Sequence, residues 1–139
     1  MRPRNKAIRE YWLDLAKNLK DDVDDFNKSR PDSKPWVRNE DGEYCFNFAN
    51  EVTDVFKRQQ TIDFLCFRFT WDDPTGDSGQ VELNEGELFA EKRFPVKTYR
   101  IVLNNDRVAM LSGTDGVTPV RIEDVKALLQ EYLKRSPRN

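Results

Sequence analysis

The fold of this chain is decided by residues 61–71, which read TIDFLCFRFTW. Apolar residues in this stretch recur with a period of two, which is the period of a β-strand. One face carries Ile62, Phe64 and Cys66, and the other carries Leu65, Phe67, Phe69 and Trp71. A strand that is apolar on both faces is typical of the centre of a sheet that is covered on both sides. We therefore expect either one helix on each face or a second copy of the chain over one face.

Shorter strand patterns flank this central segment. Upstream, Tyr44, Phe46 and Phe48 alternate with smaller residues after an Asp41-Gly42 turn signal. Residues 51–59 fit either a strand or a short helical turn, and we favour the strand. Downstream we expect a loop at 72–79, strands at 80–83 and 88–94, and a hairpin of Thr98–Leu103 with Arg107–Leu111. In that hairpin, Val108 and Met110 are expected to extend the apolar face of Tyr99, Ile101 and Leu103.

Helical periodicity marks the two ends of the chain. Near the N-terminus, apolar residues recur at steps of three and four, at Ile8, Trp12, Leu15, Leu19, Val23 and Phe26. This pattern predicts a helix from Asn5, its N-cap, to Phe26, ended by the proline-containing stretch 29–35. A second helix is expected over Arg121–Arg135, with acids in its first turn and bases in its last.

Together these elements predict an α+β fold: an N-terminal helix, an antiparallel β-meander of four to six strands, and a C-terminal helix. The 139 residues fit one domain, 1–139, with short flexible ends at about 1–5 and 136–139. Hydrophobic residues make up only 37% of the chain, but 12% of it is aromatic, and large rings can supply enough buried area for one core.

Charge and composition exclude several classes of function. The net charge is -2, whereas nucleic-acid binding needs a basic field, so we do not expect a nucleic-acid partner. Basic clusters at the two chain ends are interpreted as solvated termini: Arg2, Arg4, Lys6 and Arg9, then Lys134, Arg135 and Arg138. The chain has no run of apolar residues typical of a signal peptide or a membrane span. We expect a cytoplasmic protein without a membrane partner.

The chain contains no histidine and only two cysteines, Cys45 and Cys66. Zinc sites need clustered Cys or His, and most acid–base catalysis at neutral pH uses histidine. We interpret both cysteines as reduced, buried, small hydrophobic residues. The sequence therefore predicts no catalytic residue, no cofactor-binding residue, no metal ligand and no cofactor.

Three segments resemble known motifs but are better explained by local structure. Gly76-Asp77-Ser78-Gly79 matches the segment around a serine-protease nucleophile, but it lacks the histidine base and is interpreted as a turn. Asp21–Asp25 has the DDxxD pattern of magnesium sites in prenyl-diphosphate enzymes, and we interpret it as a solvated face, with an acidic binding patch as the alternative. Asp72, Asp73 and Asp77 do not have the spacing of a calcium loop.

Two further sets of residues leave a functional alternative open. Trp36, Phe67, Phe69 and Trp71 are expected in the core or at a subunit interface, or else lining a ligand groove. Carboxylates at Asp63, Glu82, Glu85, Glu87 and Glu91 include candidates for an acid with a raised pKa.

The sequence thus predicts a non-catalytic protein-interaction module whose partner is another protein or a second copy of itself in a homodimer. The first alternative is a small-molecule-binding domain with an aromatic pocket. The second is a hydrolase or isomerase that works with carboxylates alone.

Overall fold

The computed structural model describes residues 5–32, 35–54, 59–72, 76–87 and 93–135. Within these ranges, the side chains of 51–54, 59–64, 85–87, 93–96 and 135 are not part of the description. The elements are α1 (Lys6–Ser29), β1 (Val37–Glu40), β2 (Cys45–Asp54), β3 (Gln59–Trp71), β4 (Ser78–Glu87), β5 (Arg93–Leu103), β6 (Ala109–Ser112) and α2 (Ile122–Arg135). This is the α+β architecture that the sequence predicts.

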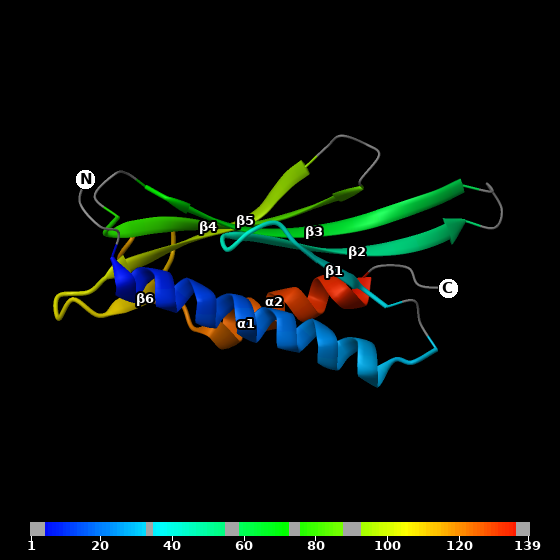
Figure 1. Ribbon diagram of the computed structural model, residues 1–139, viewed down its shortest axis with the longest axis horizontal. Coiled ribbons are helices and arrows are strands. Elements are labelled where there is room, and N and C mark those ends of the chain that lie inside the picture. Colours follow the sequence, from blue (N-terminus) through cyan, green and yellow to red (C-terminus); the bar gives the residue numbers. More distant parts are fainter. Residues whose placement is uncertain (1–4, 33–34, 55–58, 73–75, 88–92, 136–139) are drawn as a thin grey trace.

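The strands form one antiparallel sheet of six strands in the order β1-β2-β3-β4-β5-β6. Each strand pairs with its neighbour in the sequence, so the sheet is a simple meander. Both helices lie against the same face of this sheet (Figure 1). The expectation of one helix on each face is therefore wrong, and the homodimer expected as its alternative stays a prediction.

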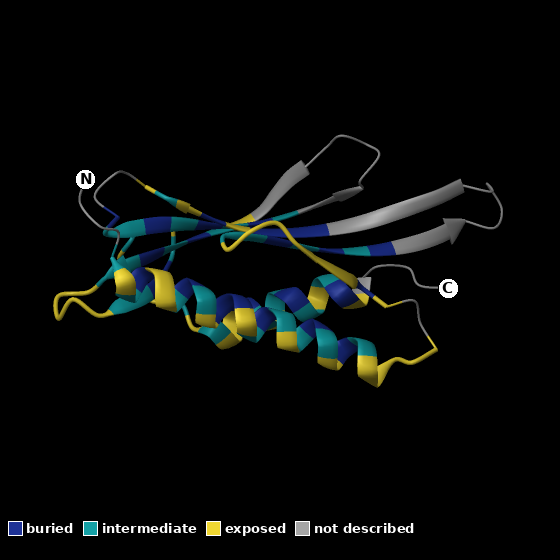
Figure 2. Cartoon of the chain, in the orientation of Figure 1, coloured by how far each residue is buried: buried dark blue, intermediate teal, exposed yellow. Residues whose placement is uncertain are grey.

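The first helix begins where the sequence predicts. The Asn5 side chain accepts hydrogen bonds from the backbone amides of Ala7 and Ile8, at 2.9 and 3.3 Å. These bonds satisfy amides that have no partner within the helix. The predicted apolar stripe is buried, together with Ala16, and it faces the sheet (Figure 2). Trp12 also donates a hydrogen bond from Nε1 to the carbonyl of Glu43, 2.9 Å away, which ties α1 to the β1–β2 turn.

Aromatic rings form the centre of the core between α1 and the sheet. Phe46 of β2 stacks on Phe67 of β3 with centroids 5.0 Å apart, and both rings are almost completely buried. Trp12 stacks on Phe69 at 5.7 Å. Rings in such contact contribute about 0.5–1.5 kcal/mol per pair beyond the burial of their area. The odd-numbered residues of β3 that the sequence assigned to one face therefore form the helix-facing side.

One strand was not predicted, and one prediction of side-chain direction was wrong. The sequence carries no signal for β1, because all four of its residues are exposed and lack an apolar period. In the β5–β6 hairpin, the register places Leu111 opposite Ile101 and Ala109 opposite Leu103, so Met110 points to the other face. Val108 precedes β6 and is 57% exposed. The prediction that Val108 and Met110 extend the apolar face of Tyr99, Ile101 and Leu103 is therefore wrong.

Candidate functional site

Among the described residues, the side of the sheet that faces away from both helices has no helix over it, and we call it the open face. Side chains alternate between the two sides of a strand, so the register assigns each residue to a face. On β2 to β6, the described side chains of the open face are Cys45, Asn47, Ala49, Cys66, Arg68, Thr70, Ser78, Gln80, Glu82, Asn84, Thr98, Arg100, Val102, Met110 and Ser112. Arg68 and Thr70 are exposed, and most of the others are half-buried.

This composition corrects the prediction that the second face of β3 is apolar. Cys66 on that face is buried, but Arg68 and Thr70 that follow it are exposed and polar. The side chains of Ile62 and Phe64 lie outside the described residues. A signal for the polar face was present in β4, where Gln80, Glu82 and Asn84 alternate with Val81 and Leu83. That alternation is typical of a sheet with one face in water.

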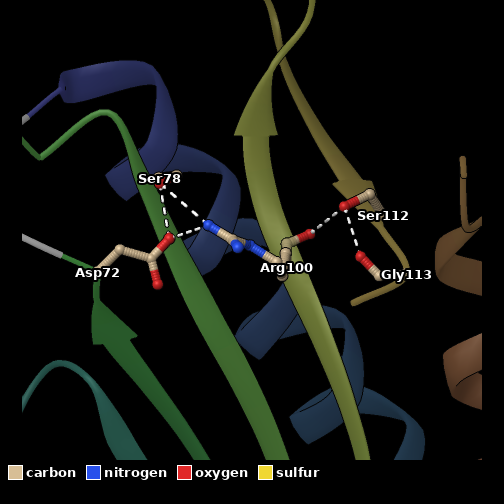
Figure 3. A network of polar contacts seen from close by, with 5 residues as sticks. All are labelled: Asp72, Ser78, Arg100, Ser112 and Gly113. Atoms are coloured by element: carbon tan, nitrogen blue, oxygen red, sulfur yellow. Dashed lines mark hydrogen bonds and ion pairs between the residues drawn. The ribbon is translucent and has the colours of Figure 1, made fainter. Parts of the chain in front are cut away.

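A polar network occupies the open face near the β3–β4 connection (Figure 3). Arg100 of β5 forms an ion pair with Asp72, and Ser78 donates a hydrogen bond to the same carboxylate oxygen at 2.6 Å. Arg100 also donates to Ser78 Oγ at 3.3 Å. The Ser112 hydroxyl donates a hydrogen bond to the carbonyl oxygen of Gly113 at 2.9 Å. Its Oγ atom also lies 3.5 Å from the carbonyl oxygen of Arg100. The network links β3, β4, β5 and β6, and its charges cancel.

The two cysteines lie together on the open face. Their Sγ atoms are 3.8 Å apart, and they are thiols rather than a disulfide. Cys66 is buried as predicted, whereas Cys45 is only half-buried. A hydrogen bond with Cys45 raises the pKa of the Arg68 guanidinium, helped by the nearby Cys66 and Glu82. Because Cys45 pairs in register with Arg68, the thiol and the guanidinium are cross-strand neighbours.

The acidic cluster Asp21–Asp25 is held by partners from other elements. Asp22 accepts a hydrogen bond from Gln130 of α2 at 3.0 Å and lies 3.7 Å from the ammonium group of Lys126. Asp24 lies 3.9 Å from the guanidinium of Arg38 on β1. Asp21 and Asp25 are exposed, as the interpretation of a solvated face expects, whereas Asp22 and Asp24 contact α2 and β1.

In the segment Gly76–Gly79, which was predicted to be a turn, Gly76 and Asp77 precede β4, whereas Ser78 and Gly79 are the first residues of that strand. Gly76 has φ +70°, and its carbonyl accepts a hydrogen bond from the amide of Asn5 at 3.0 Å. Ser78 is held by Asp72 and Arg100 and not by a base. Asp73, which the calcium-loop spacing would require, lies outside the described residues.

The aromatic groove that the sequence left open is core where the structure describes it. Trp36, Phe67 and Phe69 are 4%, 1% and 3% exposed, and Trp71 is half-buried. Asn27 fixes Trp36 by accepting a hydrogen bond from its amide and donating one to its carbonyl, both at 3.0 Å.

A pocket of about 560 Å³ lies between β5 and the segment 113–120 that follows β6. Its lining consists of Lys97, Thr98, Tyr99, Gly113, Thr114, Asp115, Thr118 and Val120. The one acidic group in this lining, Asp115, accepts hydrogen bonds from Thr118 and from the amide of Val117, which lower its pKa to about 2. The Asp115 carboxylate is thus bonded within the 115–118 turn. With its lowered pKa, it is not the acid with a raised pKa that a carboxylate enzyme needs.

The other carboxylates with a perturbed pKa are shifted in the same direction. Hydrogen bonds with Lys20, Arg9 and Arg121 lower the pKa values of Glu40, Glu43 and Asp124 respectively. Among the predicted acids, Glu82 accepts a hydrogen bond from Gln80 at 3.3 Å. The side chains of Asp63, Glu85, Glu87 and Glu91 lie outside the described residues.

At the N-terminal basic cluster, the described side chains have acidic partners. Lys6 lies 3.6 Å from Glu10, and Arg9 forms an ion pair with Glu43. Arg2, Arg4 and Arg138 lie outside the described residues. Because these two bases are paired, this part of the surface does not present the concentrated positive charge that a phosphate backbone requires.

Across the ranges that the structure describes, no three potential metal-ligating side chains gather at one point, and neither helix has the length and apolar character to cross a membrane. No family model, curated protein or solved structure matches the chain. Function is therefore inferred from the geometry of the open face.

Proposed function

We propose that this protein is a non-catalytic interaction module that binds another protein through the open face of its sheet. The observation that supports the proposal is that both helices cover one face of a six-stranded sheet. The opposite face presents side chains from the five adjacent strands β2 to β6.

The chemistry of the open face suits a reversible protein contact. Interfaces between proteins that also exist alone are no more apolar than the rest of their surfaces. On this face, amide and hydroxyl groups dominate, and the charges of Arg68, Glu82, Arg100 and Asp72 balance. A balanced polar surface avoids nonspecific association and selects a partner by the position of its hydrogen bonds.

The two alternatives have less support. A small-molecule site needs an apolar cavity with aromatic walls, and the candidate rings Trp36, Phe67 and Phe69 are buried in the core. A carboxylate enzyme needs an acid with a raised pKa, whereas hydrogen bonds lower the pKa values of Glu40, Glu43, Asp115 and Asp124.

The test compares two variants that each add one glutamate. Thr70→Glu places the charge on an exposed position of the open face, and Ala127→Glu places it on an exposed position of α2. In affinity capture from the cell that makes the protein, we expect a partner that binds the wild type and Ala127→Glu but loses at least tenfold in affinity for Thr70→Glu. Equal capture by both variants would contradict the proposal.

A second copy of the chain is the other possible occupant of the open face, and sedimentation of the purified protein distinguishes it. If the partner is the chain itself, the wild type and Ala127→Glu will sediment as dimers and Thr70→Glu as a monomer. If the partner is a different protein, all three will sediment as monomers.

A further inference from the structure

Two thiols that are 21 positions apart in the sequence lie in contact on the open face. Cys45 is in register with Arg68, and Cys66 is in register with Asn47, so the two cysteines occupy diagonal positions on neighbouring strands. Their sulfur atoms are 3.8 Å apart, which is van der Waals contact. A disulfide bond between these two sulfur atoms would replace the contact with a covalent link.

The surroundings of the two thiols differ. Cys45 is half-buried and stands in register opposite Arg68, whose side chain is exposed. The positive charge of Arg68 disfavours a metal cation between the two sulfurs. Cys66 is only 2% exposed, so an oxidant in solution meets Cys45 first.

We infer that Cys45 and Cys66 form a reversible oxidation site, in which a hydroperoxide converts the two thiols into one cross-strand disulfide. In the first step the Cys45 thiolate attacks the peroxide oxygen, the O–O bond breaks, and Cys45 becomes a sulfenic acid while water or an alcohol leaves. In the second step the Cys66 sulfur attacks the Cys45 sulfur and the sulfenic oxygen leaves as water. The two thiols lose two electrons and two protons, and the peroxide gains them.

The register explains why such a disulfide would be reversible. Diagonal residues of an antiparallel pair have Cα atoms about 7–8 Å apart. Disulfides are most stable at Cα separations of about 4.4–6.8 Å, so closing this one strains the β2–β3 pair. Strained disulfides are more easily reduced by thiols. Oxidation would also remove the Cys45 thiol as the partner of Arg68, whether or not the open face binds a protein.

The test follows the thiols of the purified full chain during treatment with hydrogen peroxide. We expect the wild type to lose two hydrogens in intact mass, to lose both thiol groups together, and to recover both on addition of dithiothreitol. In Cys66→Ser the sulfenic acid on Cys45 has no thiol to react with, so dimedone will trap it. In Cys45→Ser, oxidation of the buried Cys66 will be at least tenfold slower than oxidation of the wild type.

The inference is overturned if the wild type forms sulfinic acid or intermolecular disulfides in place of the internal bond. It is also overturned if Cys45→Ser and the wild type oxidise at the same rate.

Discussion

Replacement of Gly79 by alanine tests how the sheet packs under α1. Gly79 of β4 is in register with Trp71, and the ring of Phe69 lies across it. A Cβ atom at position 79 would lie closer than 3.0 Å to two ring carbons of Phe69 and 2.9 Å from the carbonyl oxygen of Thr70. Atoms of this kind cannot remain so close, so the ring or the strand must move.

The ring of Phe69 has little room to move. It is 3% exposed and contacts Trp12, Tyr44 and Trp71 at centroid distances of 5.7, 5.8 and 5.0 Å. Overpacking a core of this kind typically lowers the free energy of unfolding by about 1–3 kcal/mol. Each ring contact that is partly lost lowers it further, since such a contact contributes about 0.5–1.5 kcal/mol. We expect Gly79→Ala to lower the free energy of unfolding by about 3 kcal/mol, and the melting temperature by about 10 °C.

The assay is equilibrium unfolding in urea, with Gly113→Ala as the matched control. A Cβ at position 113 would meet its nearest atoms at 3.6 and 3.9 Å, which is ordinary contact, so that variant should remain within about 0.5 kcal/mol of the wild type. Phe69→Leu should recover part of the loss when combined with Gly79→Ala, because it removes ring atoms from the clash. Equal stability of the two alanine variants would refute the packing of Phe69 over Gly79.

Three further predictions concern polar contacts. Asn5→Ala removes the N-cap of α1 and should lower the free energy of unfolding by about 1 kcal/mol, measured in urea; a change below about 0.3 kcal/mol would count against the cap. Asp22→Ala removes both contacts of that carboxylate with α2 and should cost about 1–2 kcal/mol, whereas Asp21→Ala, at an exposed neighbour, should cost almost nothing. Asp115 has a folded pKa of about 2, below its ordinary value of 3.8, so its contribution to stability is present above pH 3.8 and is lost as the pH falls towards 2. The stability difference between the wild type and Asp115→Ala should therefore shrink over that range in acid-unfolding curves, and a constant difference would show that the carboxylate is not bonded as described.

The sequence was informative where side-chain periodicity is strong. The stripe from Ile8 to Phe26 and the alternation of Phe67 and Phe69 place α1 and the core face of β3 correctly, because burial of apolar area dominates those choices. In β3 apolar residues stand on both faces, so its pattern alone does not show which face receives the helices, whereas the alternation in β4 does.

Contacts between distant residues could not be predicted from local patterns. The proximity of Cys45 and Cys66 depends on the β2–β3 register, and a shift by one residue would place the two thiols on opposite faces. The partners of Asp22 come from α2, more than 100 positions later in the chain. In both cases the residue types were visible in the sequence, and only the fold brings them together.

We propose that this protein meets its partner through the open face of its sheet. Site-specific photo-cross-linking in the cell that makes the protein measures this most directly, with the reactive group placed at position 70 on the open face or at position 127 on the outer side of α2. We predict one dominant protein adduct at position 70 and none of comparable yield at position 127. An adduct that forms at position 127 and not at position 70 would contradict the claim.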